Sequence, residues 1–355
     1  MQSPPIVPVV MAGGAGVRFW PLSTDALPKQ FMTAFSETSL YQSTVARART
    51  LAPADRILVM TNATLVDLVR AQSPEIPAEN VILEPARRDT APALGLAAAL
   101  VQRRWPGSVM AVLPSDHLVR DVEGFRTSLL LAAERATQGG LGTIGIHPSY
   151  PATGYGYLHV ERGDRVRAVQ RFVEKPDRAR AETFLADGGY LWNAGIFIWQ
   201  VERFMAELGR CLPDVHGGVL TIAEAWSTPR FGNVLNEVFT GLTRQSIDYG
   251  VMEKTRDVWT VTAAFDWNDI GGWTAAMDLV PSDASGNRTR GRIVLDRAHN
   301  NFVLATDPGH PVLCAGVQDS IIVATPNGTL VCHRDLADEL KPMVEALLRP
   351  VPAPV

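Results

Sequence analysis

A glycine-rich segment near the N-terminus is the first place where residue types and spacing indicate chemistry. Residues 11–21, MAGGAGVRFWP, follow an apolar run, so several backbone N–H groups there lack side chains that would block a phosphate or a base. Arg18 and Lys29 add two cations that could neutralise a polyphosphate; without them the glycines would indicate only a tight turn. The segment lacks the Gly-Lys-Ser/Thr ending of a P-loop, and Phe19 stands where a dinucleotide-binding fingerprint requires glycine. The residues predicted to contact a nucleotide here are Ala12, Gly13, Gly14 and Gly16.

The wider motif resembles the signature of the mannose-1-phosphate guanylyltransferases, a family of sugar-nucleotide pyrophosphorylases. The resemblance rests on GGAG-x-R-x-W-P-L-S followed by P-K-Q-F, and on further segments described below. It implies that Arg18 and Lys29 act catalytically at the phosphates. Val17 and Phe19 depart from the threonine and leucine usual in the family, and the Val17 side chain has no hydroxyl for a phosphate contact.

A carboxylate beside a proline-containing turn is the candidate for base recognition. Glu84 in ILEPARRDTAPA (82–93) could accept hydrogen bonds from N1–H and the exocyclic amine of guanine together. In isolation such an acid is more typical of an exposed helix start, and the resemblance favours the guanine-binding role. The resemblance also makes Thr90 and Ala91 candidates, while Asp89 departs from the usual asparagine. We further predict that Ser115 contacts the nucleotide.

Two aspartates are candidates for a metal site. Asp116 ends an apolar strand in VLPSDHLV (112–119), at the edge where ligands of open α/β sheets bind. Asp269 in FDWNDIGGW (265–273) is the expected partner, although each aspartate alone is more typical of a turn or a helix cap. The resemblance implies that the pair binds Mg²⁺, which takes few protein ligands and keeps phosphate oxygens and water. His117 is expected to be structural, because an ionised sugar phosphate needs no base.

Three segments are predicted to hold a sugar phosphate: TGYGYL (153–158), FVEKP (172–176) and LWNAGIFIW (191–199). A carboxylate and an amide typically bind the vicinal hydroxyls of a hexose, and a lysine offers a compact charge for its phosphate. Without the match of FVEKP and WNAGIF to the family, these residues would indicate only a surface strand and a turn. The predicted sugar-phosphate residues are Gly154, Tyr155, Glu174, Lys175 and Asn193. SIDYGVMEKT (246–255) also matches the family, but its spacing predicts a mainly structural role.

Lysine is scarce in this chain. Only four of the 33 basic residues are lysine, namely Lys29, Lys175, Lys254 and Lys341. A general bias towards arginine explains most of this preference among the basic residues. Because lysine is a compact point charge and arginine a rigid planar fork, we predict that Lys29 and Lys175 are retained for phosphate.

The elements that must position these residues are strands alternating with helices. The predicted strands lie at residues 6–12, 56–60, 80–83, 109–113 and 142–146, and the predicted helices at 39–51, 63–72, 91–104 and 123–137. This alternation predicts an α/β, Rossmann-like fold with a mixed, mainly parallel sheet covered by helices on both faces. The resemblance implies the nucleotidyltransferase, GT-A-like version of that fold. Shorter β-like pieces between 151 and 200 indicate a substrate-binding half, before helical stretches at 201–210 and 246–254.

A different pattern follows the polar linker at 282–291. FVLATDPG (302–309) and IIVATPNG (321–328) repeat at a spacing of 19 residues. Successive coils of a small β-roll or β-helix would produce this repeat, and so would two alike strand-turn units in another β domain. A helix over 335–348 is expected to close the domain. We predict a catalytic domain over 1–284 and a β-rich domain over 285–355, which either packs on the catalytic domain or forms a homodimer contact.

Composition excludes several classes of protein. The chain has 355 residues, of which 46% are hydrophobic and 20% charged, as in ordinary globular proteins. Its net charge of −4 argues against nucleic-acid binding, and no uncharged apolar run reaches the roughly 18 residues of a membrane span. The first ten residues lack signal-peptide features, and three cysteines show neither disulfide nor zinc spacing. We therefore expect a cytoplasmic protein with no membrane partner.

The resemblance implies one reaction: GTP and α-D-mannose 1-phosphate give GDP-mannose and pyrophosphate, with Mg²⁺ assisting in-line attack on the α-phosphorus. Longer family members carry a fused isomerase domain, for which the chain ending at Val355 leaves no room, so we expect transferase activity alone. Two alternatives stay open. The substrates could be another nucleotide or sugar, such as UTP, dTTP or glucose 1-phosphate, or the chain could be a non-catalytic, regulatory sugar-nucleotide-binding relative.

Overall fold

The computed structural model describes residues 4–14, 19–34 and 36–349, which form two compact units. The first unit consists of residues 4–13, 44–115 and 119–267. The second unit gathers the remaining described residues, namely 14–43 apart from 15–18 and 35, then 116–118 and 268–349. The domain boundary expected at 284/285 stays a prediction. No helix in the described ranges is long and apolar enough to span a membrane.

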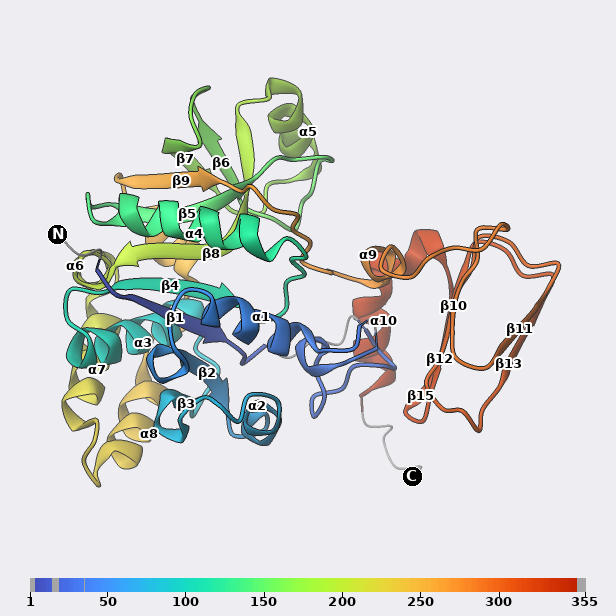
Figure 1. The fold of residues 1–355 in the computed structure, drawn as a ribbon, viewed down its shortest axis with the longest axis horizontal. Coiled ribbons are helices and arrows are strands. Elements are labelled where there is room, and N and C mark those ends of the chain that lie inside the picture. The colour runs from blue at the N-terminus through green and yellow to red at the C-terminus, as the bar shows by residue number, and fades with distance from the viewer. Residues whose placement is uncertain (1–3, 15–18, 35, 350–355) are drawn as a thin grey trace, which may run out of the picture. The chain divides into compact units, whose positions relative to one another are not determined.

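The first unit is built on a sheet that has nine strands among the described residues, in the order β3-β2-β1-β4-β8-β5-β9-β7-β6 (Figure 1). The strands are β1 (Ile6–Met11), β2 (Leu58–Asn62), β3 (Val81–Glu84), β4 (Val109–Pro114), β5 (Leu141–Ile146), β6 (Tyr157–Val160), β7 (Val166–Val173), β8 (Tyr190–Gln200) and β9 (Val258–Thr262). Each of the strands predicted before residue 150 is confirmed. Long apolar runs form them because both faces of the sheet are buried.

The predicted mixed sheet is confirmed, but parallel pairing prevails only in part of it. β3, β2, β1 and β4 pair in parallel, as do β5 and β9. The expectation of a mainly parallel sheet fails beyond β4, where β8 runs antiparallel to β4, β5 and β6. The connection between β6 and β7 is too short for a crossover helix, so these strands pair as an antiparallel hairpin.

Helices cover both faces of this sheet. Val7 and Val9 of β1 share a buried cluster with residues of α3, α6, α7 and α8, while α4 contacts β4, β5, β8 and β9 outside that cluster (Figure 1). The α-helices of the first half are α1 (Leu40–Arg49), α2 (Val66–Gln72), α3 (Thr90–Arg104) and α4 (Val122–Ala136), as predicted. The later ones are α5 (Arg178–Asp187), α6 (Val201–Cys211), α7 (Pro213–Ala225) and α8 (Phe231–Gly241). Two 3₁₀ turns, η2 (Ala54–Arg56) and η3 (Ala78–Asn80), precede β2 and β3.

The predicted helical stretch at 246–254 is a short π-helix, η4 (Asp248–Met252). Ile247, Val251 and Met252 are buried there, in agreement with the structural role that the spacing of this segment predicts. π-helical turns are rare and often occur at functional sites, because the extra residue redirects neighbouring side chains.

The second unit contains a stack of parallel strands. The strands β10 (Arg288–Arg290), β12 (Phe302–Ala305), β14 (Ser320–Thr325) and β15 (Gly328–His333) form one sheet, and β11 (Ile293–Asp296) pairs with β13 (Val312–Ala315). Phe302 pairs with Ile321 and Ile293 with Val312, so these two parallel registers advance by the predicted repeat of 19 residues, whereas β10 pairs with β12 at a spacing of 14, Arg288 with Phe302. The coil interpretation of that repeat is therefore confirmed, whereas β14 and β15 form an antiparallel hairpin.

Buried asparagines join successive coils. Asn301 Nδ2 donates to Asn287 Oδ1 over 3.0 Å, and Asn301 Oδ1 accepts from the Ser320 amide over 3.0 Å. The remaining elements of this unit are η1 (Lys29–Phe31), α9 (Trp273–Met277), η5 (Arg334–Glu339) and α10 (Leu340–Leu347). The helix predicted over 335–348 thus consists of a 3₁₀ turn followed by an α-helix.

Candidate active site

Lys29, Asp116 and Asp269 meet within the second unit. The Lys29 ammonium lies 2.9 Å from Asp116 Oδ2 and donates to the backbone carbonyls of Asp269 (2.6 Å) and Ile270 (3.2 Å). Asn268 Oδ1 accepts from the Ile270 amide, and Ile270 takes a left-handed conformation with φ of 43°, which turns this loop tightly. Three residues predicted from separate motifs are therefore neighbours around one ammonium group.

The surroundings of the Asp116 side chain favour its ionised form. Desolvation by the surrounding protein would raise its pKa, but the charge and hydrogen bond of Lys29 and the nearby His117 outweigh this effect and lower the pKa to about 2. His117 Nε2 lies 3.7 Å from Asp116 Oδ1. Asp116 is therefore anionic at neutral pH, beside a position that already holds a cation.

This group of residues fits a hard divalent cation that takes few protein ligands. Carboxylate oxygens are suitable donors for such an ion. Within the described ranges, no three or more His, Cys, Asp or Glu side chains are grouped so that they could hold a metal. Asp116 and Asp269 would thus supply only part of the coordination, leaving the rest to substrate oxygens and water.

The glycine-rich loop begins where β1 ends. The Ala12 amide donates to the Met60 carbonyl over 2.8 Å, and the Gly13 carbonyl accepts from Asn62 Nδ2 over 3.4 Å. In the second unit, Gln30 Nε2 donates to the carbonyl of the exposed Gly14 over 2.8 Å. The predicted phosphate-binding residues Gly16 and Arg18 lie outside the described residues.

Glu84, the predicted base-recognition residue, lies at the end of β3 and next to Gly13. A Cβ added at Gly13 would lie 3.4 Å from Glu84 Oε1, so the carboxylate is within van der Waals distance of this backbone position. Burial raises the pKa of Glu84 to about 7. A half-buried carboxylate of this kind is suited to accepting hydrogen bonds from the N–H donors of a ligand.

The other described residues predicted to contact the nucleotide form hydrogen bonds within the protein. Thr90 Oγ1 accepts from the Ile247 amide over 2.8 Å, and the Ala91 amide donates to Gln245, so both fasten the start of α3 to the 245–247 segment. The Ser115 hydroxyl donates to the Met11 carbonyl over 2.7 Å. Asp89, whose departure from asparagine left its role open, caps α3 by accepting from the Thr90 amide, and has a φ of 69°.

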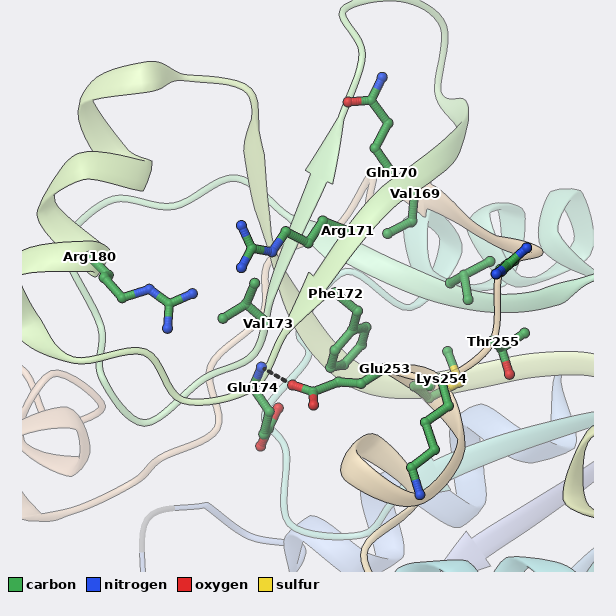
Figure 2. A pocket seen from close by; sticks show the side chains of 13 residues that line it. Val169, Gln170, Arg171, Phe172, Val173, Glu174, Arg180, Glu253, Lys254 and Thr255 are labelled. Atoms are coloured by element: carbon green, nitrogen blue, oxygen red, sulfur yellow. Dashed lines mark hydrogen bonds between the residues drawn. The ribbon is translucent and has the colours of Figure 1, made fainter. Parts of the chain in front are cut away.

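The predicted sugar-phosphate residues Glu174 and Asn193 converge on Gly156. A Cβ at Gly156 would lie 2.6 Å from Glu174 Oε2 and 3.3 Å from the Asn193 Cβ, so only glycine fits there without displacing a neighbour. Lys175 Nζ lies 3.3 Å from Glu174 Oε1, and Lys175 takes a left-handed conformation with φ of 44°. Glu253 Oε1 accepts from the Glu174 amide over 2.9 Å (Figure 2).

Asp248 belongs to this group, and the sequence interpretation of its segment as mainly structural overlooked it. Asn193 Nδ2 donates to Asp248 Oδ1 over 3.3 Å, while Asn193 Oδ1 accepts from Thr143 Oγ1 over 2.7 Å. Burial, followed by the negative charge of Glu174, raises the pKa of Asp248. The family match of SIDYG was the one signal in the sequence that could have identified it.

Tyr155 lies in an aromatic cluster beside these residues. Its ring makes edge contacts with Trp192 at 5.1 Å and Trp267 at 5.4 Å between ring centroids. Its hydroxyl lies 3.2 Å from that of Tyr150. A Cβ at Gly154 would meet no atom within 4 Å, so this predicted residue borders open space.

Comparison with known proteins agrees with this architecture. A family model described as "Nucleotidyl transferase" matches residues 7–285, and one described as "MannoseP isomerase/GMP-like beta-helix domain" matches residues 291–347. A mannose-1-phosphate guanylyltransferase of Klebsiella pneumoniae is 35% identical over 350 residues, which cover 96% of this chain and 74% of the relative. The xanthan biosynthesis protein XanB of Xanthomonas campestris pv. campestris is 34% identical over 96% of this chain and 73% of its own length.

A solved structure extends the similarity to the fold. A protein from Thermus thermophilus, named mannose-1-phosphate geranyltransferase, has a TM-score of 0.86 at 32% identity, covering 96% of this chain and 99% of that one. The resemblance inferred from the motifs is thus confirmed. The chain belongs to the nucleotidyl transferase family, is an enzyme of that family, and within it is similar to mannose-1-phosphate guanylyltransferases.

Proposed function

We propose that the protein transfers GMP from GTP to α-D-mannose 1-phosphate, yielding GDP-mannose and pyrophosphate. The similarity to relatives named for this activity supports the proposal, and the observation that carries it is the Lys29 cluster with Asp116 and Asp269. Transfer between phosphates needs positioning and charge neutralisation more than covalent help from the protein, and this cluster concentrates those charges.

The chemical step forms one P–O bond and breaks another. A phosphate oxygen of the sugar phosphate attacks the α-phosphorus of GTP, the bond to the β-phosphate breaks, and pyrophosphate leaves. Because the attacking oxygen is already ionised at neutral pH, no residue has to remove a proton. Lys29 would stabilise charge on the phosphates, and Arg18 would share this role on the strength of its motif.

The substrates would be recognised by residues of the first unit. The Glu84 carboxylate would accept from N1–H and the exocyclic amine of guanine, beside the backbone of Ala12 and Gly13. Glu174 and Asn193 would bind hexose hydroxyls, and Lys175 would attract the sugar-bound phosphate.

Asp116 and Asp269 would hold Mg²⁺, for which two carboxylates and several exchangeable oxygens are a suitable set. When bound, such an ion neutralises phosphate charge and aligns the reacting groups. The low pKa of Asp116, about 2, keeps that ligand ionised throughout the working pH range.

A cytoplasmic location and a homodimer stay predictions from the sequence. The substrate assignment is tested by measuring pyrophosphate release with GTP, ATP, UTP or dTTP against mannose 1-phosphate or glucose 1-phosphate. We expect the highest kcat/KM for GTP with mannose 1-phosphate. A preference for UTP, dTTP or glucose 1-phosphate would overturn the assignment of substrates, and no release with any pair would indicate a non-catalytic relative.

A further inference from the structure

Glu174 borders a basic cavity in the first unit whose cations have no role in the proposed reaction. It has a volume of about 680 Å³ and is lined by β7, α5 and the segment between η4 and β9 (Figure 2). Its charged residues are Arg171, Arg180, Lys254, Arg256, Glu174 and Glu253.

The charges in this cavity are unbalanced. Four cations face two carboxylates, in a chain whose net charge is −4. The Glu174 carboxylate already has a cation, since Lys175 Nζ lies 3.3 Å away outside the cavity lining. Among the described residues, none of the four lining cations forms an ion pair with an acid; Arg178, a neighbour of Arg180 on α5, pairs with Glu182 instead. An anion entering this cavity would therefore meet an excess of positive charge.

Two of the lining cations are arginines that come from different elements. Figure 2 shows the guanidinium groups of Arg171, from β7, and Arg180, from α5, pointing toward one another. The planar guanidinium fork matches phosphate oxygens and binds them through pairs of charge-assisted hydrogen bonds. A cavity of this volume accommodates a small molecule rather than a lone inorganic ion.

We propose that this cavity is a second anion site, which binds a phosphate-bearing small molecule through Arg171 and Arg180. The site adjoins the sugar-phosphate residues through Glu253, whose carboxylate accepts from the Glu174 amide over 2.9 Å and whose chain neighbour is Lys254. A bound anion adds negative charge next to Glu174 and Lys175, so it weakens binding of the sugar phosphate. This second part rests on the proposed function; the binding itself does not.

The test uses inorganic phosphate as the probe and calorimetry at constant ionic strength in chloride buffer. We expect the wild type to bind phosphate, Arg180→Gln to bind it roughly tenfold more weakly, and Arg171→Gln/Arg180→Gln to lose the binding attributed to this cavity. Arg178→Gln is the matched control, because it removes the same charge from the same helix at a residue that does not line the cavity. All three arginines are exposed, so the variants should fold, as thermal melting would show.

Equal phosphate affinity in the wild type and the double variant, or no phosphate binding by the wild type, would overturn the proposal. The effect of bound phosphate on binding of the sugar phosphate is measured in a second experiment, by initial rates. Phosphate should raise the KM for mannose 1-phosphate in the wild type and Arg178→Gln, and not in the double variant, with basal activity equal in all three. An unchanged KM in the wild type would refute the coupling. Absence of basal activity would count against the proposed function, while the calorimetry would still decide the anion site.

Discussion

Replacing Gly156 with alanine should selectively damage the sugar-phosphate site. The added Cβ would lie 2.6 Å from Glu174 Oε2, where ordinary van der Waals contact begins at 3.4 Å. The carboxylate must therefore move by roughly 0.8 Å. It has little freedom to do so, because only 8% of the Glu174 side chain is exposed and Lys175 lies 3.3 Å from its other oxygen.

The size of the effect follows from the hydrogen bonds that this movement would disturb. A hydrogen bond to a charged group contributes about 1.5–3 kcal/mol, and about 1.4 kcal/mol corresponds to a factor of ten. Misplacing one carboxylate bond to the hexose should thus reduce kcat/KM for mannose 1-phosphate roughly 10- to 100-fold. The KM for GTP should stay near the wild-type value, because the role proposed for Glu174 is in binding the sugar and not the nucleotide.

The matched control is Gly163→Ala, in the connection between β6 and β7, where an added Cβ also meets no atom within 4 Å. Steady-state pyrophosphate release, with each substrate varied in turn, distinguishes the two variants, and circular dichroism verifies that both are folded. If Gly156→Ala and Gly163→Ala gave the same kcat/KM, or if the loss appeared in the KM for GTP, the placement of Glu174 in the sugar site would be refuted.

Three further predictions address other parts of the molecule. Lys29→Met should lower kcat roughly 10²–10³-fold. Lys29→Arg should also impair turnover, because a planar guanidinium does not fit a position bounded by contacts of 2.6–3.2 Å. Wild-type initial rates in Lys29→Arg would contradict this prediction. The guanine-binding role proposed for Glu84 needs its ionised form, and burial raises its pKa to about 7, so kcat/KM for GTP should fall about tenfold per pH unit below pH 7. Glu84→Gln should have a lower kcat/KM and retain only the titration of GTP itself, so an identical pH profile in the variant would count against the role. Asn301→Ala should lower the free energy of unfolding of the coil by about 2–4 kcal/mol, because its buried hydrogen bonds to Asn287, Val317 and Ser320 are lost. An unchanged midpoint in denaturant would show that these hydrogen bonds do not stabilise the coil.

Much of the fold is predictable because burial and repetition leave local patterns. The apolar runs of β1 and β4 indicate strands buried on both faces, and the 19-residue repeat becomes the register of β12 and β14. The orientation of β8 cannot be predicted from local patterns in this way. Its antiparallel pairing with β4 depends on the path of the chain over the sheet, which no local pattern specifies.

The candidate site likewise contains some residues that local motifs predict and others that they do not. Lys29, Asp116 and Asp269 could be proposed from their motifs, since each lies in a loop next to a recognisable signature. Asp248 could not, because its contact with Asn193 joins residues 55 apart and depends on a π-helical turn where spacing predicts an ordinary helix. The raised pKa of Glu84 likewise arises from burial in the folded chain, which the residue's own segment does not reveal.

We propose that this chain transfers GMP to mannose 1-phosphate with the help of a divalent cation. ³¹P NMR of the full chain with equimolar GTP and α-D-mannose 1-phosphate tests it directly, in the presence of Mg²⁺ and after chelation. We expect loss of the GTP resonances, with matching appearance of pyrophosphate and of the diphosphate of GDP-mannose, only when Mg²⁺ is present. Unchanged GTP and mannose 1-phosphate, or full turnover in excess chelator, would contradict it.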